Sequence, residues 1–333
     1  MAFNRLAPED FVISSDSITA TLWSEGTVTL TKFNTSSTQE AGSSGDFYLN
    51  VFQTASNDNN AAVQFAIAYG NRYASGSTFY NNGVTTASPT RTTYGQYRNL
   101  ILGDENAQFV FGTVTSSDFW VINIDRTRYK ESLLPGSLTL ILSGSGKLSL
   151  TDDSQISPTT IFNDAGRVYQ IVSGAAGTVF TGINSNGYST NSGSYGWFLP
   201  DIGTILLNPL ATSASINLSP SRSVNSDGLN YQKLFTAISG GASFKINSQE
   251  TISSDYIFIR ARNAEFNYSE NPSFISGSTG EVVFNQFINN PQTFLTTIGL
   301  YNDNMELLAV AKMSRPLLKD FTKEALVRVK LDF

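Results

Sequence analysis

The sequence has no histidine and no cysteine among its 333 residues. Histidine-based general acid–base catalysis and cysteine nucleophiles are therefore excluded, as are zinc sites built on imidazole or thiolate ligands. A serine triad is excluded with them, because its general base is missing. These absences remove most of the usual routes to catalysis, and we predict no cofactor and no metal, but the composition alone does not say what the protein does.

Charged side chains are scarce as well. They make up 14% of the residues, against about 25% in ordinary soluble domains. A weakly charged surface repels its neighbours weakly, which favours close association with other chains, although a secreted β protein with few surface charges has the same composition. The net charge of −6 and the pI of about 4.8 argue against binding to nucleic acid or to an anionic membrane.

Long apolar runs are missing too. The longest clusters, residues 119–124 and 256–259, have the length of strands and are too short to cross a bilayer. The first eleven residues include Pro8, Glu9 and Asp10 and contain no apolar run. We therefore predict that the chain has no signal peptide and is made in a cytosol.

What the sequence does contain is alternation of apolar and polar residues, which is typical of strands. Val63, Phe65, Ile67 and Tyr69 share one face of such a pattern. Two pairs of segments are separated by short polar turns and predict hairpins. These pairs are 138–142 with 147–150, and 300–301 with 307–310.

The alternation predicts a mainly β fold with sandwich- or barrel-like sheets, long ordered loops and one or two short helices. The clearest helix includes Leu229, Tyr231, Leu234, Phe235 and Ile238, with Asp227 as N-cap and Gly240 and Gly241 as the C-terminal stop. We expect a β domain over residues 1–150. Residues 151–333 then form a loop-rich region followed by a second β domain, and a single interwoven unit is the alternative.

Several side chains are candidates for contacts with other chains. The segment 151–230 lacks a regular apolar pattern but contains aromatic rings, which we expect to be buried against a neighbouring subunit. The last residues of the chain alternate as an amphipathic strand that we expect to be pinned in a sheet. The interface candidates are Tyr188, Tyr195, Trp197, Val327, Val329, Leu331 and Phe333.

Other polar clusters have plainer interpretations. Asp152, Asp153 and Ser154 offer oxygen ligands for Ca²⁺, but a polar turn explains them. Carboxylates could also be paired for glycoside hydrolysis, although any chain with 27 acidic residues contains such pairs. Those carboxylates are Asp104, Glu105, Asp125 and Glu131.

A cationic strand and a tyrosine cluster complete the candidates. Arg126, Arg128 and Lys130 share one face if the segment is a strand, and we favour a solvated strand end or an ion-pair seam over nucleic-acid contact. Five tyrosines could stack on sugars, but we favour packing between subunits. They are Tyr69, Tyr73, Tyr80, Tyr94 and Tyr97.

Three segments near the end of the chain carry a resemblance. They are FIRARNAEFNYSENPSF at 258–274, NPQTFLTTIGLYND at 290–303, and LLAVAK at 307–312, followed by Arg315 and Pro316. They resemble virion structural proteins of contractile-tailed bacteriophages, above all those of marine cyanobacteria, and the opening LAPEDF at 6–11 fits the same group. The third segment with TIGLYND also resembles phage tail-fibre and tail-collar proteins.

The resemblance implies a structural subunit of a virion, in the tail or baseplate, made in the host cytoplasm. Its partners are then other copies of itself and other virion proteins, with no catalytic residues, no nucleic acid and no membrane. The alternatives are a receptor- or glycan-binding module of the tail tip or fibre, a polysaccharide-degrading tailspike and a capsid decoration protein. Glycan-array binding favours the first alternative, and release of sugar favours the second.

Overall fold

The computed structural model describes residues 5–23, 31–34, 48–52, 59, 61–74, 90–157, 160–180, 191–222, 229–269 and 271–332. Strands account for 48% of the structure and helices for 18%, which confirms the mainly β fold. Helices are more numerous than the one or two short ones expected, since the described residues contain α1, α2, α3 and α4.

The chain forms two units. One, which we call the sheet unit, is Ile18–Glu250, and the other, the terminal unit, combines Met1–Ser17 with Thr251–Phe333. This division differs from the expected boundary at residue 150, because that position lies inside β10 (Lys147–Asp152) in the middle of a sheet. The two chain ends belong to one unit, which a division by sequence position cannot reveal.

The sheet unit contains a sheet of twelve antiparallel strands within the described residues. The predicted hairpin of 138–142 with 147–150 is confirmed, with Leu142 opposite Leu148 and Leu140 opposite Leu150. In spatial order the main path is β16 (Ser243–Lys245), β9 (Thr139–Ser143), β10, β12 (Gly166–Ala175), β14 (Gly196–Leu199), β15 (Thr204–Leu207), β7 (Asp118–Ile124), β4 (Val63–Asn71), β3 (Tyr48–Phe52) and β2 (Thr31–Asn34). Beside β12 lie β11 (Ile161–Asn163) and β13 (Thr178–Val179).

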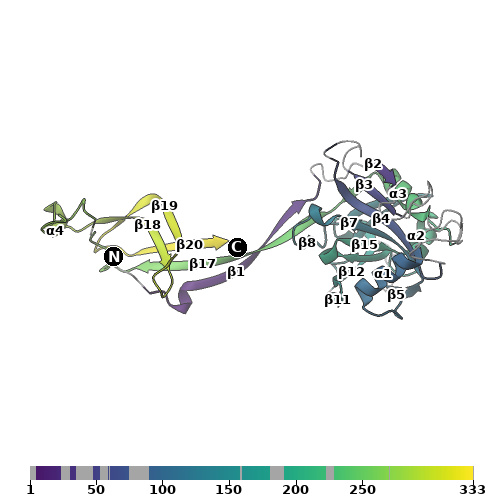
Figure 1. Ribbon diagram of the computed structural model, residues 1–333, viewed down its shortest axis with the longest axis horizontal. Helices are drawn as coiled ribbons and strands as arrows, with labels where there is room; N and C mark the ends of the chain where they lie inside the picture. Colours follow the sequence, from purple (N-terminus) through teal and green to yellow (C-terminus); the bar gives the residue numbers. More distant parts are fainter. Residues whose placement is uncertain are drawn as a thin grey trace. The chain divides into compact units, whose positions relative to one another are not determined.

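Helices cover both faces of this sheet (Figure 1). Along β7, Trp120 and Ile122 belong to the cluster that contains α3 (Asn230–Gly241) and residues of α2 (Pro209–Ile216). Phe119 and Val121 belong to the cluster that contains α1 (Thr90–Leu102). Successive side chains of a strand point to opposite faces, so β7 is buried on both sides and reads as one continuous apolar run.

The sheet curls around α3. This helix touches β9 and β16 near one end of the strand order and β4 and β3 near the other. The ring of Phe244 on β16 packs edge-on against that of Phe65 on β4, with centroids 5.2 Å apart. The helix is the one predicted from the sequence, and it ends where Ala242 takes a left-handed backbone conformation. The expected N-cap Asp227 lies outside the described residues.

Smaller elements connect these strands, and each lies in the sheet unit. They are β5 (Phe109–Phe111), β6 (Val114–Ser116), β8 (Ser132–Leu133), η2 (Arg126–Arg128) and η3 (Pro200–Ile202).

The terminal unit is built from long strands with few helical residues. β17 (Asn247–Ala261) pairs with β20 (Ala325–Asp332) over eight residue pairs, and β1 (Phe11–Thr21) pairs with β17. Both β1 and β17 begin in one unit and end in the other. The second predicted hairpin is confirmed as β18 (Thr293–Tyr301) with β19 (Leu307–Lys319). The short helices are η1 (Pro8–Asp10) and α4 (Gln286–Asn289).

Candidate functional site

The terminal unit has almost no apolar core of its own. Among its described residues the buried apolar side chains are Ile257, Ala261, Ala325 and Val329. Neither of the two large apolar clusters of the described chain includes a residue of this unit. Ordering the backbone costs about 1–2 kcal/mol per residue, and four small contributions of burial do not offset that cost over such a length of chain.

Large apolar side chains of this unit are instead exposed, and together we call them the apolar surface. They occur on both strands of the β18–β19 hairpin and in its turn, on β1, on β20, and in the segments before β18 and after β19. They are Phe11, Val12, Ile13, Tyr268, Val282, Val283, Phe284, Ile288, Phe294, Tyr301, Met305, Leu307, Leu308, Val310, Leu317, Phe321 and Leu326. A small unit that exposes this many large apolar side chains and buries few of its own is a candidate for contact with another molecule.

The unpaired strand edges of the terminal unit also indicate a contact with another molecule. In the described residues β18 and β19 pair only with each other. An isolated two-stranded hairpin is marginally stable in water, and its outer edges present unpaired N–H and C=O groups. Phe294, which is 62% exposed, and Leu308, which is 68% exposed, gain burial only if further chain covers the hairpin.

One buried cation fixes the base of this hairpin. Lys319, at the end of β19, is fully buried. Its Nζ donates hydrogen bonds to the carbonyl oxygen of Asn263 at 3.0 Å, to Oδ1 of Asn267 at 2.9 Å and to the carbonyl oxygen of Asp320 at 3.1 Å. The loop after β17 is thereby tied to the hairpin, so the exposed side chains are presented from an anchored base.

The terminal strand is placed as the sequence predicts, although its apolar face turns inward. Val329 is buried, and Val327 and Leu331 are half-buried, opposite Ile257, Ile259 and Asp255 of β17. Phe333 lies outside the described residues. These side chains stabilise the sheet of the terminal unit, and the exposed residues of β20 lie on its other face.

The central interface candidates are placed differently from the expectation. Tyr195 is buried in the core of the sheet unit, and its hydroxyl lies 2.7 Å from Oγ of Ser215. Burial also raises the pKa of Tyr195. Trp197 is half-buried on β14 and packs edge-on against Phe109 and Phe111. These two rings are therefore buried within the chain itself, and Tyr188 lies outside the described residues.

The expected loop-rich region is also more regular than predicted. It contains β11, β12, β13, β14, β15 and α2. β15 is buried at all four positions, so its side chains show no alternation of apolar and polar character. A strand buried on both faces lacks the period of two on which the expectation rested.

The tyrosine cluster is mostly core as well. Tyr69 and Tyr94 are buried, and desolvation raises the pKa of Tyr97 to about 12. Tyr73 is exposed, and Tyr80 lies outside the described residues. The described tyrosines do not form an exposed stacking platform for sugars or for another subunit, because α1 carries Tyr94 and Tyr97 against the ring of Phe119.

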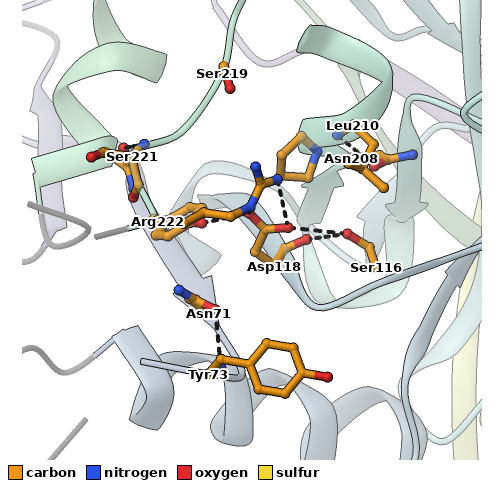
Figure 2. Close-up of polar contacts among 12 residues, drawn as sticks. Asn71, Tyr73, Ser116, Asp118, Asn208, Leu210, Ser219, Ser221 and Arg222 are labelled. Carbon is orange, nitrogen blue, oxygen red and sulfur yellow. Dashed lines mark hydrogen bonds and ion pairs between the residues drawn. The ribbon is translucent and has the colours of Figure 1, made fainter. Parts of the chain in front are cut away.

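A buried carboxylate in the sheet unit, that of Asp118, is the centre of a polar network (Figure 2). Asp118 accepts hydrogen bonds from the Tyr69 hydroxyl at 2.6 Å and from Nε and Nη2 of Arg222 at 2.8 and 3.2 Å. Its side chain is 2% exposed and that of Arg222 is 45% exposed. The Ser116 hydroxyl donates to the carbonyl oxygen of Asp118 at 2.8 Å.

Neighbouring amides complete this network. Asn230 bonds Ser221 twice, accepting from its N–H at 2.8 Å and donating to its carbonyl oxygen at 2.7 Å. Asn208 caps α2 through the N–H of Leu210 at 3.0 Å. Each of these polar groups has partners from the chain itself, so the network holds Ser221 and Arg222 against the sheet.

Asp152 and Asp153 hold a turn together, as the plainer interpretation predicts. Asp152 accepts from the N–H of Gly136 at 2.8 Å, and Asp153 accepts from the N–H of Gln170 at 2.9 Å. Desolvation raises the pKa of Asp152, and it raises that of Asp153 to about 6. In the described residues no group of three or more carboxylates is arranged to hold a metal ion.

The other acidic candidates have local roles. Asp104 accepts from the N–H of Asn106 at 2.8 Å. Asp125 caps η2 through the N–H of Thr127 at 2.9 Å. Glu105 and Glu131 are exposed.

The cationic segment does not form the expected strand. Arg126 and Arg128 lie in η2, because Asp125 caps a helical turn there. Arg126 donates to the carbonyl oxygen of Tyr129 at 2.8 Å and lies over its ring. Lys130 lies 3.9 Å from Glu250, an exposed ion pair that agrees with the expected seam and contributes little stability.

A shallow depression of about 540 Å³ lies beside α3, lined in part by Asn217, Ser219, Lys233 and Thr236. The Lys233 ammonium there already donates to the carbonyl oxygen of Ser219 at 3.2 Å. None of the helices in the described residues has the length and apolar character that a membrane crossing requires.

Comparison with known proteins finds no matching family model, no similar curated protein and no similar solved structure. The apolar surface of the terminal unit is therefore the candidate functional site, on the strength of its own geometry.

Proposed function

We propose that this chain is a structural subunit of a bacteriophage virion, placed in the tail or baseplate, and that it acts by protein–protein contacts and not by catalysis. One observation carries the proposal. The terminal unit exposes large apolar side chains while burying only Ile257, Ala261, Ala325 and Val329 among its described residues. A unit of this kind gains its stability from the molecules that cover it.

The place of the resemblance in the fold supports the same proposal. The segments 258–274, 290–303 and 307–312 all belong to the terminal unit. They span the end of β17, the whole of β18 and the start of β19. These segments carry six residues of the apolar surface, namely Tyr268, Phe294, Tyr301, Leu307, Leu308 and Val310.

Cryo-electron microscopy of purified virions tests the proposal. Particles of the phage that encodes this chain are compared with particles carrying a small tag on the chain, and the added density locates it. We expect the density in the tail or baseplate, with the terminal unit covered by protein. Density on the capsid surface would favour a decoration protein, and absence of the chain from washed particles would overturn the proposal.

A further inference from the structure

Two arginines of the sheet unit, Arg72 and Arg98, lie on the side of the sheet that α1 covers, and we call them the arginine pair. Arg72 directly follows β4, and its N–H donates to the carbonyl oxygen of Ser117 at 2.8 Å, so strand pairing extends to this residue. Side chains alternate along a strand, and Arg72 therefore shares the face of Gly70 and not that of Asn71.

The helix α1 crosses this face at Gly70. A Cβ on Gly70 would lie 3.1 Å from the Cα of Tyr94, so the glycine allows the helix to pack closely on the strand. Arg98 lies one turn after Tyr94 on the same side of the helix. Arg72 lies two residues, about 7 Å, along the strand from the crossing. Both members of the arginine pair are half-buried, so the fold places two cations beside one helix–strand contact.

Buried polar atoms at this contact lack partners. Neither Nη1 of Arg72 nor the hydroxyl of Tyr94 makes a hydrogen bond of good geometry, although both atoms are buried. Arg98 donates to the amide oxygen of Asn99 at 3.4 Å, a long contact with a neutral group. Desolvation raises the pKa of Tyr94, and the backbone of Phe109 acts against that rise. Arg72 and Arg98 also lower this pKa, so both guanidinium groups lie within electrostatic reach of the hydroxyl.

Carboxylates of the neighbouring elements do not neutralise the arginine pair. Asp118 projects from the opposite face of the sheet, where it is paired with Arg222 at 2.8 Å. Asp104 accepts from a backbone N–H in the turn after α1, and Asp164 lies beside Gly103 at the C-terminal end of that helix. Within the part of the chain that the structure describes, neither arginine of the pair has a carboxylate in ion-pair range.

Two partly buried positive charges near each other are unfavourable unless an anion compensates them. A bound water would satisfy a hydrogen bond of Nη1 but would leave both charges uncompensated. We propose that the arginine pair and the Tyr94 hydroxyl form a site for a tetrahedral oxyanion of the phosphate or sulfate type. Such a dianion matches the two charges, and its four oxygens accept hydrogen bonds from several donors at once. The site belongs to the sheet unit and does not depend on the contacts proposed for the terminal unit.

Isothermal titration calorimetry of the full-length chain with sodium phosphate tests this site, with sodium chloride at equal ionic strength as the reference. Wild type should bind one phosphate per chain, and Arg72→Gln and Arg98→Gln should each bind it at least about tenfold more weakly. Arg91→Gln removes an exposed arginine of the same helix, so it is the matched control and should bind as wild type does. Phenyl phosphate identifies the source of the anion. Equal affinity for this ester indicates a phosphoryl group on a larger molecule, and much weaker binding indicates the free ion; both outcomes support the site.

Urea unfolding with and without phosphate separates binding from folding. Phosphate should raise the urea midpoint of wild type and of Arg91→Gln, because a ligand that binds only the folded state stabilises it, and should leave the midpoint of Arg72→Gln unchanged. Each protein is compared with itself, so a variant that is merely less stable does not alter this readout, and Arg98→Gln repeats the test at the second guanidinium. A wild type that binds no phosphate, a chloride effect of equal size, or arginine variants that respond as wild type does overturns the inference. The cryo-electron microscopy above tests the virion role separately.

Discussion

Replacing Arg222 by alanine should lower the free energy of unfolding of the sheet unit by about 2–3 kcal/mol. Removing one partner of a buried ion pair typically costs about 3–5 kcal/mol, because the other charge stays buried without compensation. The cost is smaller here for two reasons. Asp118 keeps the Tyr69 hydroxyl at 2.6 Å, and the half-exposed Arg222 leaves a path through which water reaches the carboxylate.

The double variant distinguishes this reasoning from a simple loss of packing. Asp118→Ala alone removes the acceptor of Tyr69 and Arg222, and we expect it to cost about 2–3 kcal/mol. Asp118→Ala with Arg222→Ala leaves no buried charge unpaired, so its cost should fall at least about 1.5 kcal/mol below the sum of the single costs.

Tryptophan fluorescence during urea unfolding measures the free energy of unfolding of the sheet unit in each variant. All three tryptophans, Trp23, Trp120 and Trp197, lie within the sheet unit, so the signal reports that unit. Lys233→Ala is the matched control, because its exposed ammonium donates a hydrogen bond to the carbonyl oxygen of Ser219 and no ion pair of it is found within the described residues; it should change stability by less than about 0.5 kcal/mol. Additive single costs, or an Arg222→Ala variant as stable as the control, would refute the argument.

Gly241→Ala should destabilise the sheet unit by about 1–3 kcal/mol, because the new Cβ meets the carbonyl oxygen of Ile141. Gly95→Ala, on α1, places its Cβ near no neighbouring atom and should stabilise the unit by about 0.5–1 kcal/mol. Equal urea midpoints for the two variants would contradict this prediction. Folding raises the pKa of the Asp153 carboxyl from 3.8 to about 6, so the folded state holds this proton more tightly than the unfolded state does. The wild-type protein should therefore lose stability relative to Asp153→Asn as the pH rises from about 4 to 6. Parallel curves of stability against pH for the two proteins would contradict this. Deleting residues 327–333 removes most of β20, the partner strand of β17. The shortened chain should no longer self-associate in light scattering, while its tryptophan-monitored unfolding stays unchanged. A shortened chain that still assembles would count against this prediction.

Local pattern predicted the elements whose contacts are local. The hairpins at 138–150 and 300–310 and the helix at 230–241 follow from short spacing, turn residues and apolar periodicity. The last strand was predicted as well, since one of its faces is buried and the other exposed.

α1 was missed because its sequence argues weakly for a helix. Threonines fill its first turn, and Gly95 lies in its middle. Its helical signal is the spacing of Tyr94, Tyr97 and Ile101, which places all three on one face. The helix is stabilised by packing of that face against Phe119 and its neighbours, a contact that local propensity does not reveal.

Pairings between residues far apart in the sequence account for the remaining differences between the predicted and the observed structure. β1 pairs with β17, and Asp118 pairs with Arg222 across 104 residues. Nothing in the immediate surroundings of either residue indicates its partner. The division into units and the central polar network both depend on such pairings, so they emerge only from the folded chain.

Sedimentation equilibrium of the purified full-length chain over a wide concentration range tests most directly whether the protein acts by association. The terminal unit is expected to be covered by further copies, so the fitted mass should rise with concentration to a multiple of 36.1 kDa. A single species of 36.1 kDa at every concentration would contradict the account.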